Sequence, residues 1–225
     1  MLEFVNTADG SKTIYNSDVG ENYHSTHGAL QESRHVFINA GLKYFLNSVH
    51  TEVSILEVGF GTGLNFLLSA EVCAGNGINL DYIGIEAYPL SKDMISQTGY
   101  DQYVPAAIWE SFVDNYDASF KNSISLNTLC KLQTRHCRLK DFQSAQQYDI
   151  IYYDAFASAR QPEMWDEGAI GHAIQFLKPG GIFVTYAITG NLKRRLKALG
   201  CTIEKLPGAL GKREMLRGRM SEHEF

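Results

Sequence analysis

Short apolar runs and amphipathic segments alternate along most of this chain. The runs typical of buried strands fall at 53–58, 80–86, 127–133, 149–154, 180–187, 202–206 and 213–219. Helical spacing falls at 28–49, 63–73, 102–118, 166–177 and 191–199. Strands that alternate with helices are typical of a parallel sheet covered on both faces. Because the last two strands can pair as a hairpin, the pattern predicts an α/β fold with a mostly parallel, doubly wound sheet and a C-terminal antiparallel hairpin.

Three alternating glycines follow the first of these strands. Gly59, Gly61 and Gly63 connect it to the next helix, and without a Cβ they allow a tight turn and a ligand lying against bare backbone. The second strand ends in Glu86, where a carboxylate can accept hydrogen bonds from ribose hydroxyls. Taken singly, the glycines fit an ordinary turn and Glu86 a solvated strand end. Together they predict a site for a nucleotide-like cofactor.

The spacing of the glycines indicates which cofactor. A dinucleotide fingerprint requires Gly-x-Gly-x-x-Gly, and here the third glycine comes one residue early. The Gly-x-Gly-x-Gly loop resembles motif I of class I S-adenosylmethionine-dependent methyltransferases, a Rossmann-like family whose cofactor has no phosphate. The resemblance implies S-adenosylmethionine, with contacts predicted at Glu57, Gly59, Gly61, Gly63, Asn65 and Glu86. Asp141 is predicted to bind the adenine amino group, with a mobile surface carboxylate as the alternative.

Composition and sequence pattern predict a single domain with no membrane-spanning segment and no metal site. The chain has 225 residues, 44% hydrophobic and 20% charged, enough for one sizeable core. We expect a lid and a helix in 1–50 and a Rossmann-like core in 51–225. No bilayer-spanning run or signal sequence is evident, so a cytoplasmic location is expected. The four cysteines show no Cys-x-x-Cys pair, and His24 and His27 lack a supporting ligand pattern, so no metal is predicted.

Positive charge is concentrated near the C-terminus. The net charge is −5, yet residues 192–219 hold nine Lys and Arg against two Glu. This asymmetry suits a face that meets phosphates, and Arg194, Arg195, Lys212 and Arg213 are the candidate contacts. A solvated amphipathic helix over 191–199 explains the same charges equally well.

The fourth predicted strand ends at the most informative acid. In doubly wound sheets the chemistry lies beyond the carboxyl ends of the strands, which is where Asp154 falls. A capping or salt-bridge role is the alternative for this carboxylate. In the loop that follows, Phe156 and Trp165 are candidate stacking surfaces for an aromatic base, although such aromatics are often core residues. Tyr186, at the end of the next strand, is a candidate lining residue.

Several of these motifs resemble one family across nearly the whole chain. The segments are Gly-Phe-Gly-Thr-Gly-Leu-Asn-Phe at 59–66, Asp-Ala-Phe-Ala at 154–157, Pro-Glu-Met-Trp at 162–165, Lys-Pro-Gly-Gly at 178–181, Gly-Lys-Arg-Glu-Met-Leu at 211–216, Tyr-His-Ser at 23–25 and the stretch 28–37. They are similar to the methyltransferase half of the bifunctional tRNA 5-methylaminomethyl-2-thiouridine biosynthesis enzymes. One departure is Ser158, where that family usually has proline.

The resemblance implies methyl transfer from S-adenosylmethionine to the amine of 5-aminomethyl-(2-thio)uridine at the tRNA wobble position. It implies a stand-alone enzyme without the FAD-dependent oxidase half, which binds the tRNA anticodon arm and relies on other enzymes for the aminomethyl precursor. Asp154 is the predicted catalytic residue: it orients the amine and accepts its proton, directly or through water.

Two other readings stay open at this stage. A small-amine methyltransferase or an aminopropyltransferase shares this fold and often has an aspartate after the fourth strand, but needs no basic C-terminal stretch. A tRNA-binding module without catalysis has no need of the glycines, Glu86 and Asp154. Measurable cofactor binding discriminates the last reading from the others.

Overall fold

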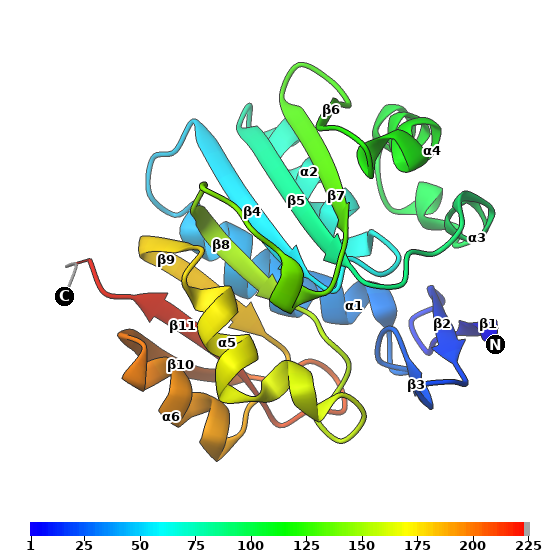
Figure 1. Cartoon of the computed structure of the whole chain (residues 1–225). Helices are drawn as coiled ribbons and strands as arrows, with labels where there is room; N and C mark the ends of the chain where they lie inside the picture. Colours follow the sequence, from blue (N-terminus) through cyan, green and yellow to red (C-terminus); the bar gives the residue numbers. More distant parts are fainter. Residues whose placement is uncertain (223–225) are drawn as a thin grey trace.

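The computed structural model describes residues 1–222, and its centre is an eight-stranded mixed sheet (Figure 1). The strands are β4 (Glu52–Val58), β5 (Asn79–Glu86), β6 (Ile124–Ser125), β7 (Cys130–His136), β8 (Tyr148–Tyr153), β9 (Leu177–Thr185), β10 (Cys201–Pro207) and β11 (Glu214–Met220). Their order is β10-β11-β9-β8-β4-β5-β7-β6. β7, β5, β4, β8 and β9 are parallel, and β11 pairs antiparallel with both β9 and β10. The predicted α/β fold with a C-terminal hairpin is confirmed.

Helices cover both faces of the sheet, as expected for parallel strands buried on both sides. They are α1 (Ala29–Ser33), continued by the π-helical η1 (Arg34–Lys43), then α2 (Leu64–Gly75), α3 (Lys92–Ser96), α4 (Ala106–Ser119), α5 (Glu167–Ile174) and α6 (Gly190–Ala198), with short 3-10 turns at Tyr100–Gln102, Leu139–Asp141 and Pro162–Trp165. In Figure 1, α5 and α6 lie in front of the sheet and α1 and α2 behind it.

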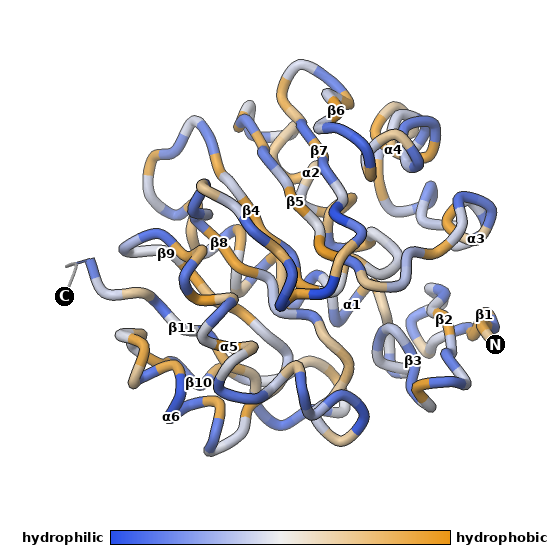
Figure 2. Tube along the Cα trace, in the orientation of Figure 1, coloured by the Kyte–Doolittle hydropathy of each residue, from blue (hydrophilic) through white to orange (hydrophobic). Residues whose placement is uncertain are grey.

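A core lies on each face. The cluster under η1, α2 and α4 contains the interlocked rings of Phe66, Tyr82 and Phe112, and the cluster under α5 and α6 contains Tyr153 and Phe183. Figure 2 shows hydrophobic residues recurring along β4, β5 and β8. These apolar faces hold the carboxyl ends of the central strands in fixed positions. Among residues 1–222, no helix has the length and apolar composition needed to cross a membrane.

The N-terminal segment forms a separate small sheet that the hydrophobic pattern does not predict. It consists of β1 (Leu2–Asn6), β2 (Lys12–Asn16) and β3 (Glu21–Asn22), all antiparallel. Its turn is held by Asp9, whose Oδ1 accepts hydrogen bonds from the Thr7 and Ser11 hydroxyls. Its strands are short, β1 has no buried residue, and β2 and β3 are mostly polar, so the apolar signal that marks a strand is weak here. The predicted range 51–225 ends in three residues, 223–225, that lie outside the described part of the chain.

Two predicted boundaries are wrong for identifiable reasons. The strand predicted at 127–133 is β7, which begins three residues later because Asn127 Oδ1 accepts from the Leu129 N–H (2.8 Å) in the turn from β6. The strand predicted from 180 begins at Leu177, paired with Tyr148. The glycines at 180 and 181 therefore lie within β9, where its register with β8 shifts, rather than before the strand.

Candidate functional site

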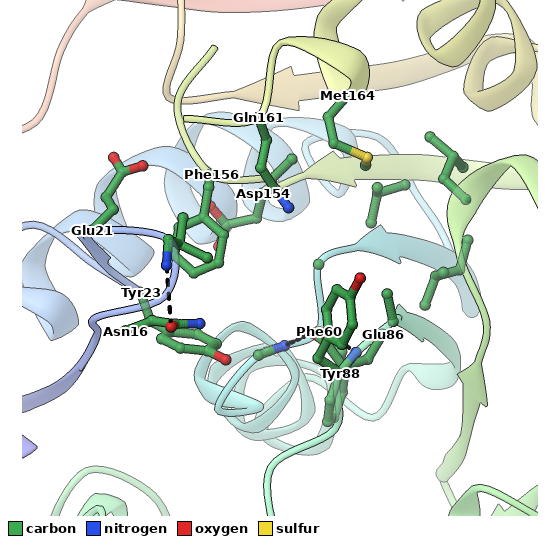
Figure 3. Close-up of a pocket in the computed structure, with 18 of the residues that line it drawn as sticks. Asn16, Glu21, Tyr23, Phe60, Glu86, Tyr88, Asp154, Phe156, Gln161 and Met164 are labelled. Atoms are coloured by element: carbon green, nitrogen blue, oxygen red, sulfur yellow. Dashed lines mark hydrogen bonds between the residues drawn. The ribbon is translucent and has the colours of Figure 1, made fainter. Parts of the chain in front are cut away.

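A cavity of about 710 Å³ opens at the carboxyl ends of β4, β5, β8 and β9. The strand order reverses between β4 and β8, and ligands of doubly wound sheets bind at such a reversal. In Figure 3, Glu86 and Tyr88 lie on one side of this cavity, and Asp154 and Phe156 lie on the other. Residues 16, 19 and 21–26 of the N-terminal segment form a further wall.

The glycine loop lines the cavity through bare backbone. Gly59 has φ +88°, and a Cβ there would lie 2.4 Å from the backbone oxygen of Asp154. Gly61 has φ +52°, and its Cβ would lie 3.0 Å from the ring of Tyr23. L side chains rarely adopt these conformations. The loop therefore fits tightly between the end of β8 and the N-terminal segment, with its backbone exposed to a ligand. Gly63 lies outside the cavity lining, at the start of α2.

Glu86 is held at the end of β5 by backbone hydrogen bonds. Its Oε2 accepts from the Gly61 N–H (2.9 Å) and its Oε1 from the Tyr88 N–H (2.9 Å). Burial raises the pKa of this carboxyl, and the backbone donors oppose that rise. The carboxylate is thus fixed in orientation against the glycine loop, with lone pairs left for the hydroxyls of a ligand.

Asn65 links two carboxylates beneath the loop. Its Nδ2 donates to Glu57 Oε1 (2.8 Å) and to Asp154 Oδ2 (2.9 Å), and Glu57 Oε2 accepts from the Tyr82 hydroxyl (2.8 Å). Glu57 is only 1% exposed and does not line the cavity. Its predicted direct contact with the cofactor is therefore not supported by its position. It supports Asn65 and, through Asn65, Asp154.

The pKa of the Asp154 carboxyl, which lies in the cavity wall, is strongly raised. Burial raises its pKa to about 8, the charge of Glu32 adds to the rise, and the Asn65 hydrogen bond and Lys212 oppose it. The position follows from the fold, because the Asp154 N–H donates to the Val58 oxygen (2.9 Å) where β8 leaves β4. An acid with a pKa in this range can exchange a proton near neutral pH.

The aromatic residues predicted near Asp154 divide into two groups. Phe156 lines the cavity and meets Tyr23 edge-on, with 5.1 Å between ring centroids. Tyr186 also lines it and donates to the Ala155 oxygen (2.9 Å). Trp165 is 6% exposed, packs on Tyr153 and lies outside the lining. Its place in the core does not support the predicted stacking role, whereas Phe156 and Tyr186 face the space.

The four predicted phosphate contacts lie in different environments. Arg194 on α6 and Arg213 are exposed, and the Arg194 guanidinium donates to Asn191 Oδ1. Arg195 is partly buried and donates to the Trp165 oxygen, so it fastens α6 to the loop after β8. Lys212 lies in the cavity wall, 2.7 Å from Glu32 Oε2. Of the four residues, only Arg194 and Arg213 are exposed and can contact a large polyanion.

Asp141 does not reach the cavity. It is exposed, and its Oδ2 lies 3.7 Å from Arg138 Nε, while the preceding residues Leu139 and Lys140 contribute to the lining. Its predicted adenine contact therefore has no support in the geometry, and the surface alternative describes its position.

Sequence reasoning missed several lining residues. These are Glu21, Tyr23, Glu32, Tyr88, Gln161 and Met164. Glu21 Oε2 accepts from the Ala157 N–H (3.0 Å), which joins the N-terminal sheet to the loop after β8. Tyr23 and Glu32 fall within segments that carried the family resemblance, which was the available signal for them.

The lining fits S-adenosylmethionine chemically. Carboxylates at Glu86 and Asp154 suit hydroxyl and cationic groups, the loop at Gly59 and Gly61 admits a close approach, and Tyr88 is an exposed ring beside Glu86. Asn65 leaves its buried Oδ1 without a hydrogen-bond partner within residues 1–222, so this corner of the site retains unused acceptor capacity.

Comparison with known proteins agrees with this geometry. The family model "S-adenosyl-L-methionine-dependent methyltransferase" matches residues 103–221. The tRNA 5-methylaminomethyl-2-thiouridine biosynthesis bifunctional protein of Leptospira borgpetersenii is 29% identical over 224 residues, covering 89% of this chain and 32% of that protein. That of Magnetococcus marinus is 30% identical over 228 residues, covering 95% and 34%. The chain thus spans about a third of the length of these relatives.

Solved structures share the fold. The crystal structure of MnmC2 from Aquifex aeolicus superposes with a TM-score of 0.78 at 21% identity, covering 100% of this chain and 72% of that one. A Listeria monocytogenes structure described as a class I S-adenosylmethionine-dependent methyltransferase gives 0.53 at 15% identity, covering 88% and 62%.

The sheet order and the glycine loop are those of the class I S-adenosylmethionine-dependent methyltransferase fold. Because the family model matches more than half of its length, the chain belongs to the S-adenosyl-L-methionine-dependent methyltransferase family.

Proposed function

We propose that this enzyme methylates the primary amine of 5-aminomethyl-(2-thio)uridine at the wobble position of tRNA, giving 5-methylaminomethyl-(2-thio)uridine. The names of the curated relatives support this substrate, and the alignment covers most of the chain. The observation that carries the proposal is Asp154, an acid with a pKa near 8 in the wall of a cavity that also presents Phe156 to an aromatic base. Methyl transfer consumes the aminomethyl group, so a separate reaction must supply it.

The chain's residues act on the amine rather than on the methyl group. The bound cofactor supplies a methyl group on a positively charged sulfur, which needs no further activation. The amine must be neutral to attack. As the C–N bond forms and the C–S bond breaks, the positive charge passes from sulfur to nitrogen, and the Asp154 carboxylate can balance the charge of the ammonium and then take one of its protons. Asn65 fixes the orientation of Asp154 through its 2.9 Å hydrogen bond. Alignment of the reacting atoms then supplies much of the rate acceleration.

The direct test is methyl transfer from labelled S-adenosylmethionine into tRNA that carries 5-aminomethyluridine at the wobble position. We expect 5-methylaminomethyluridine in the nucleoside digest, and no label in the same tRNA without the aminomethyl group. Spermidine serves as the small-amine control. Transfer to spermidine but not to the modified tRNA would replace the proposal with the small-amine reading, and cofactor binding without any transfer would favour the non-catalytic one.

The reaction should depend on pH through Asp154. Because the pKa of Asp154 is raised to about 8, its carboxylate is present above that pH and is lost as the pH falls. We expect kcat to fall about tenfold per unit below the midpoint. The positive charge of the bound cofactor favours the carboxylate, so the midpoint should lie somewhat below 8 and within the range from pH 6 to 8. A single-turnover profile that stays flat from pH 6 to 8 would contradict the proton-acceptor role.

Exposed cations on α6 and in the turn between β10 and β11 are proposed to bind the RNA backbone. We expect Arg194→Ala to weaken tRNA binding and to reduce the slope of log K against log salt by about one. Lys121→Ala, an exposed lysine in the turn between α4 and β6, is the control and should leave the slope unchanged. A filter-binding series at several salt concentrations measures both, and equal slopes for both variants would remove Arg194 from the RNA contact.

A further inference from the structure

An ion pair with no assigned role stands in the wall of the cavity that Asp154 also lines. Lys212 Nζ lies 2.7 Å from Glu32 Oε2 and 3.7 Å from the centroid of the Tyr186 ring. Glu32 Oε1 also accepts from the Ser25 N–H (3.1 Å). The Glu32 side chain is 7% exposed and the Lys212 side chain 32%. Both residues line the cavity, so the pair faces the space that the substrate amine would enter.

Contacts with the N-terminal part of the chain fix the position of Lys212. Lys212 lies in the turn between β10 and β11, and the turn is docked on the N-terminal part of the chain. Gly211 has φ +83°, and a Cβ there would lie 2.3 Å from the His27 ring. His35 Nε2 lies 2.8 Å from the Pro207 oxygen. The turn therefore meets α1 and η1 at several points, and Lys212 has a fixed position relative to Glu32.

A gain in folding stability is not enough to explain why an ion pair occupies this position. Removing two charges from water is costly, and an apolar pair of similar volume is often as stable. The two charges do act on the carboxyl of Asp154. The charge of Glu32 raises the pKa of Asp154, and that of Lys212 lowers it.

The other groups facing Asp154 complete its electrostatic environment. They are Asn65 on α2, the carboxyl of Glu57 on β4 and the hydroxyl of Tyr186 after β9. His24, also in the cavity wall, is neutral near pH 7 because burial lowers its pKa to about 4. Among the titratable groups that act on Asp154, Lys212 supplies the positive charge that offsets Glu32.

We infer that Glu32 and Lys212 are positioning residues for methyl transfer: the two charges act on Asp154 in opposite directions, Lys212 offsets the effect of Glu32 there, and Lys212 disfavours the protonated amine. The inference rests on the proposed function for its substrate. Its electrostatic part concerns Asp154 alone and can be measured without any substrate.

The test follows the carboxyl carbon of Asp154 by ¹³C NMR during a pH titration of protein labelled at aspartate, with the Asp154→Asn protein used to assign the signal. Wild type should titrate at about 8. Glu32→Gln should lower the midpoint by about one unit, and Lys212→Met should raise it by about one unit. Lys121→Met is the matched control and should leave it unchanged.

The double variant distinguishes an electrostatic effect on Asp154 from a disruption of the cavity wall. If the two residues act through their charges, Glu32→Gln combined with Lys212→Met should titrate close to wild type, because the two shifts oppose each other. A disrupted wall would instead move both single variants in the same direction. Thermal melting of each variant confirms that the titrated species is folded.

Methyl transfer supplies the second readout. We expect the acid limb of the kcat profile to move with the NMR midpoints, and Lys212→Arg to keep the wild-type limb. Midpoints that do not move, or that move in one direction for both single variants, would overturn the inference. Absence of methylation of aminomethyl-tRNA by wild type, with opposite NMR shifts present, would instead reject the proposed substrate and leave the role of the pair standing.

Discussion

Methyl transfer at pH 8 should fall by two to four orders of magnitude, roughly, when Asp154 is replaced by asparagine. The amide keeps the size of the side chain and can accept the hydrogen bond from Asn65 Nδ2, now 2.9 Å from Oδ2. It cannot balance the charge of the ammonium product or take the proton that this product releases. Single-turnover transfer into aminomethyl-tRNA measures the loss. The exposed Asp117→Asn on α4 is the control and should behave as wild type.

The same substitution should make the cofactor-free protein more stable at neutral pH. In the unfolded chain Asp154 ionises near its ordinary value of 3.8, whereas in the folded protein its pKa is about 8. Between these two values the unfolded state releases the proton and the folded state retains it. Stability therefore falls as pH rises through this window and levels off above about 8. Asparagine removes that penalty, which is on the order of a few kcal/mol.

Urea unfolding of both proteins at pH 5 and pH 8 measures this effect. The free energy of unfolding of the asparagine variant should exceed that of wild type by more at pH 8 than at pH 5. A difference that does not depend on pH would show that Asp154 is not ionised against a penalty in the folded state. Lost transfer together with gained stability is the result expected of a functional acid kept in an unfavourable environment.

The part of the site that follows from local rules could be predicted from the sequence. Gly59 and Asp154 stand directly after buried parallel strands and Glu86 is the last residue of one, and the carboxyl ends of such strands meet at one edge of a sheet. The structure brings all three to the cavity. Their meeting in one cavity also depends on the strand order, because β8, β4 and β5 are neighbours in the sheet.

The rest depends on contacts between distant segments. Glu32 and Lys212 meet although 180 residues separate them, and nothing in their local sequence indicates that the turn after β10 reaches α1. Charge alone therefore predicts Lys212 on an RNA surface, whereas it is paired with Glu32 in the cavity wall. The direction of the Trp165 side chain could not be predicted for a related reason. The direction of a side chain in an irregular loop is set by packing, and its ring turns to Tyr153 in the core.

The glycine loop should tolerate no side chain at Gly59. A Cβ there would lie 2.4 Å from the Asp154 oxygen and 3.0 Å from its carbonyl carbon, both rigid backbone atoms, and φ is +88°. Gly59→Ala must therefore separate the ends of β4 and β8 or change its backbone conformation, at a cost of about 1–3 kcal/mol. Because Gly59 lines the cavity and its N–H donates to the Ile85 oxygen (3.0 Å), cofactor binding should weaken at least tenfold, roughly.

Calorimetric titration of S-adenosylmethionine into the folded variant measures that loss, and thermal melting measures the change in stability. Gly75→Ala is the matched control. Gly75 ends α2 with no atom within 4 Å of an added Cβ, so alanine there should leave binding unchanged and stabilise the helix by up to about 1 kcal/mol. If Gly59→Ala bound the cofactor as wild type does, the bare backbone at this turn would serve packing of β4 on β8 alone. Weakened binding in a variant that remains folded shows instead that the loop which positions Asp154 also holds the cofactor, so that one turn aligns the methyl donor with the proton acceptor.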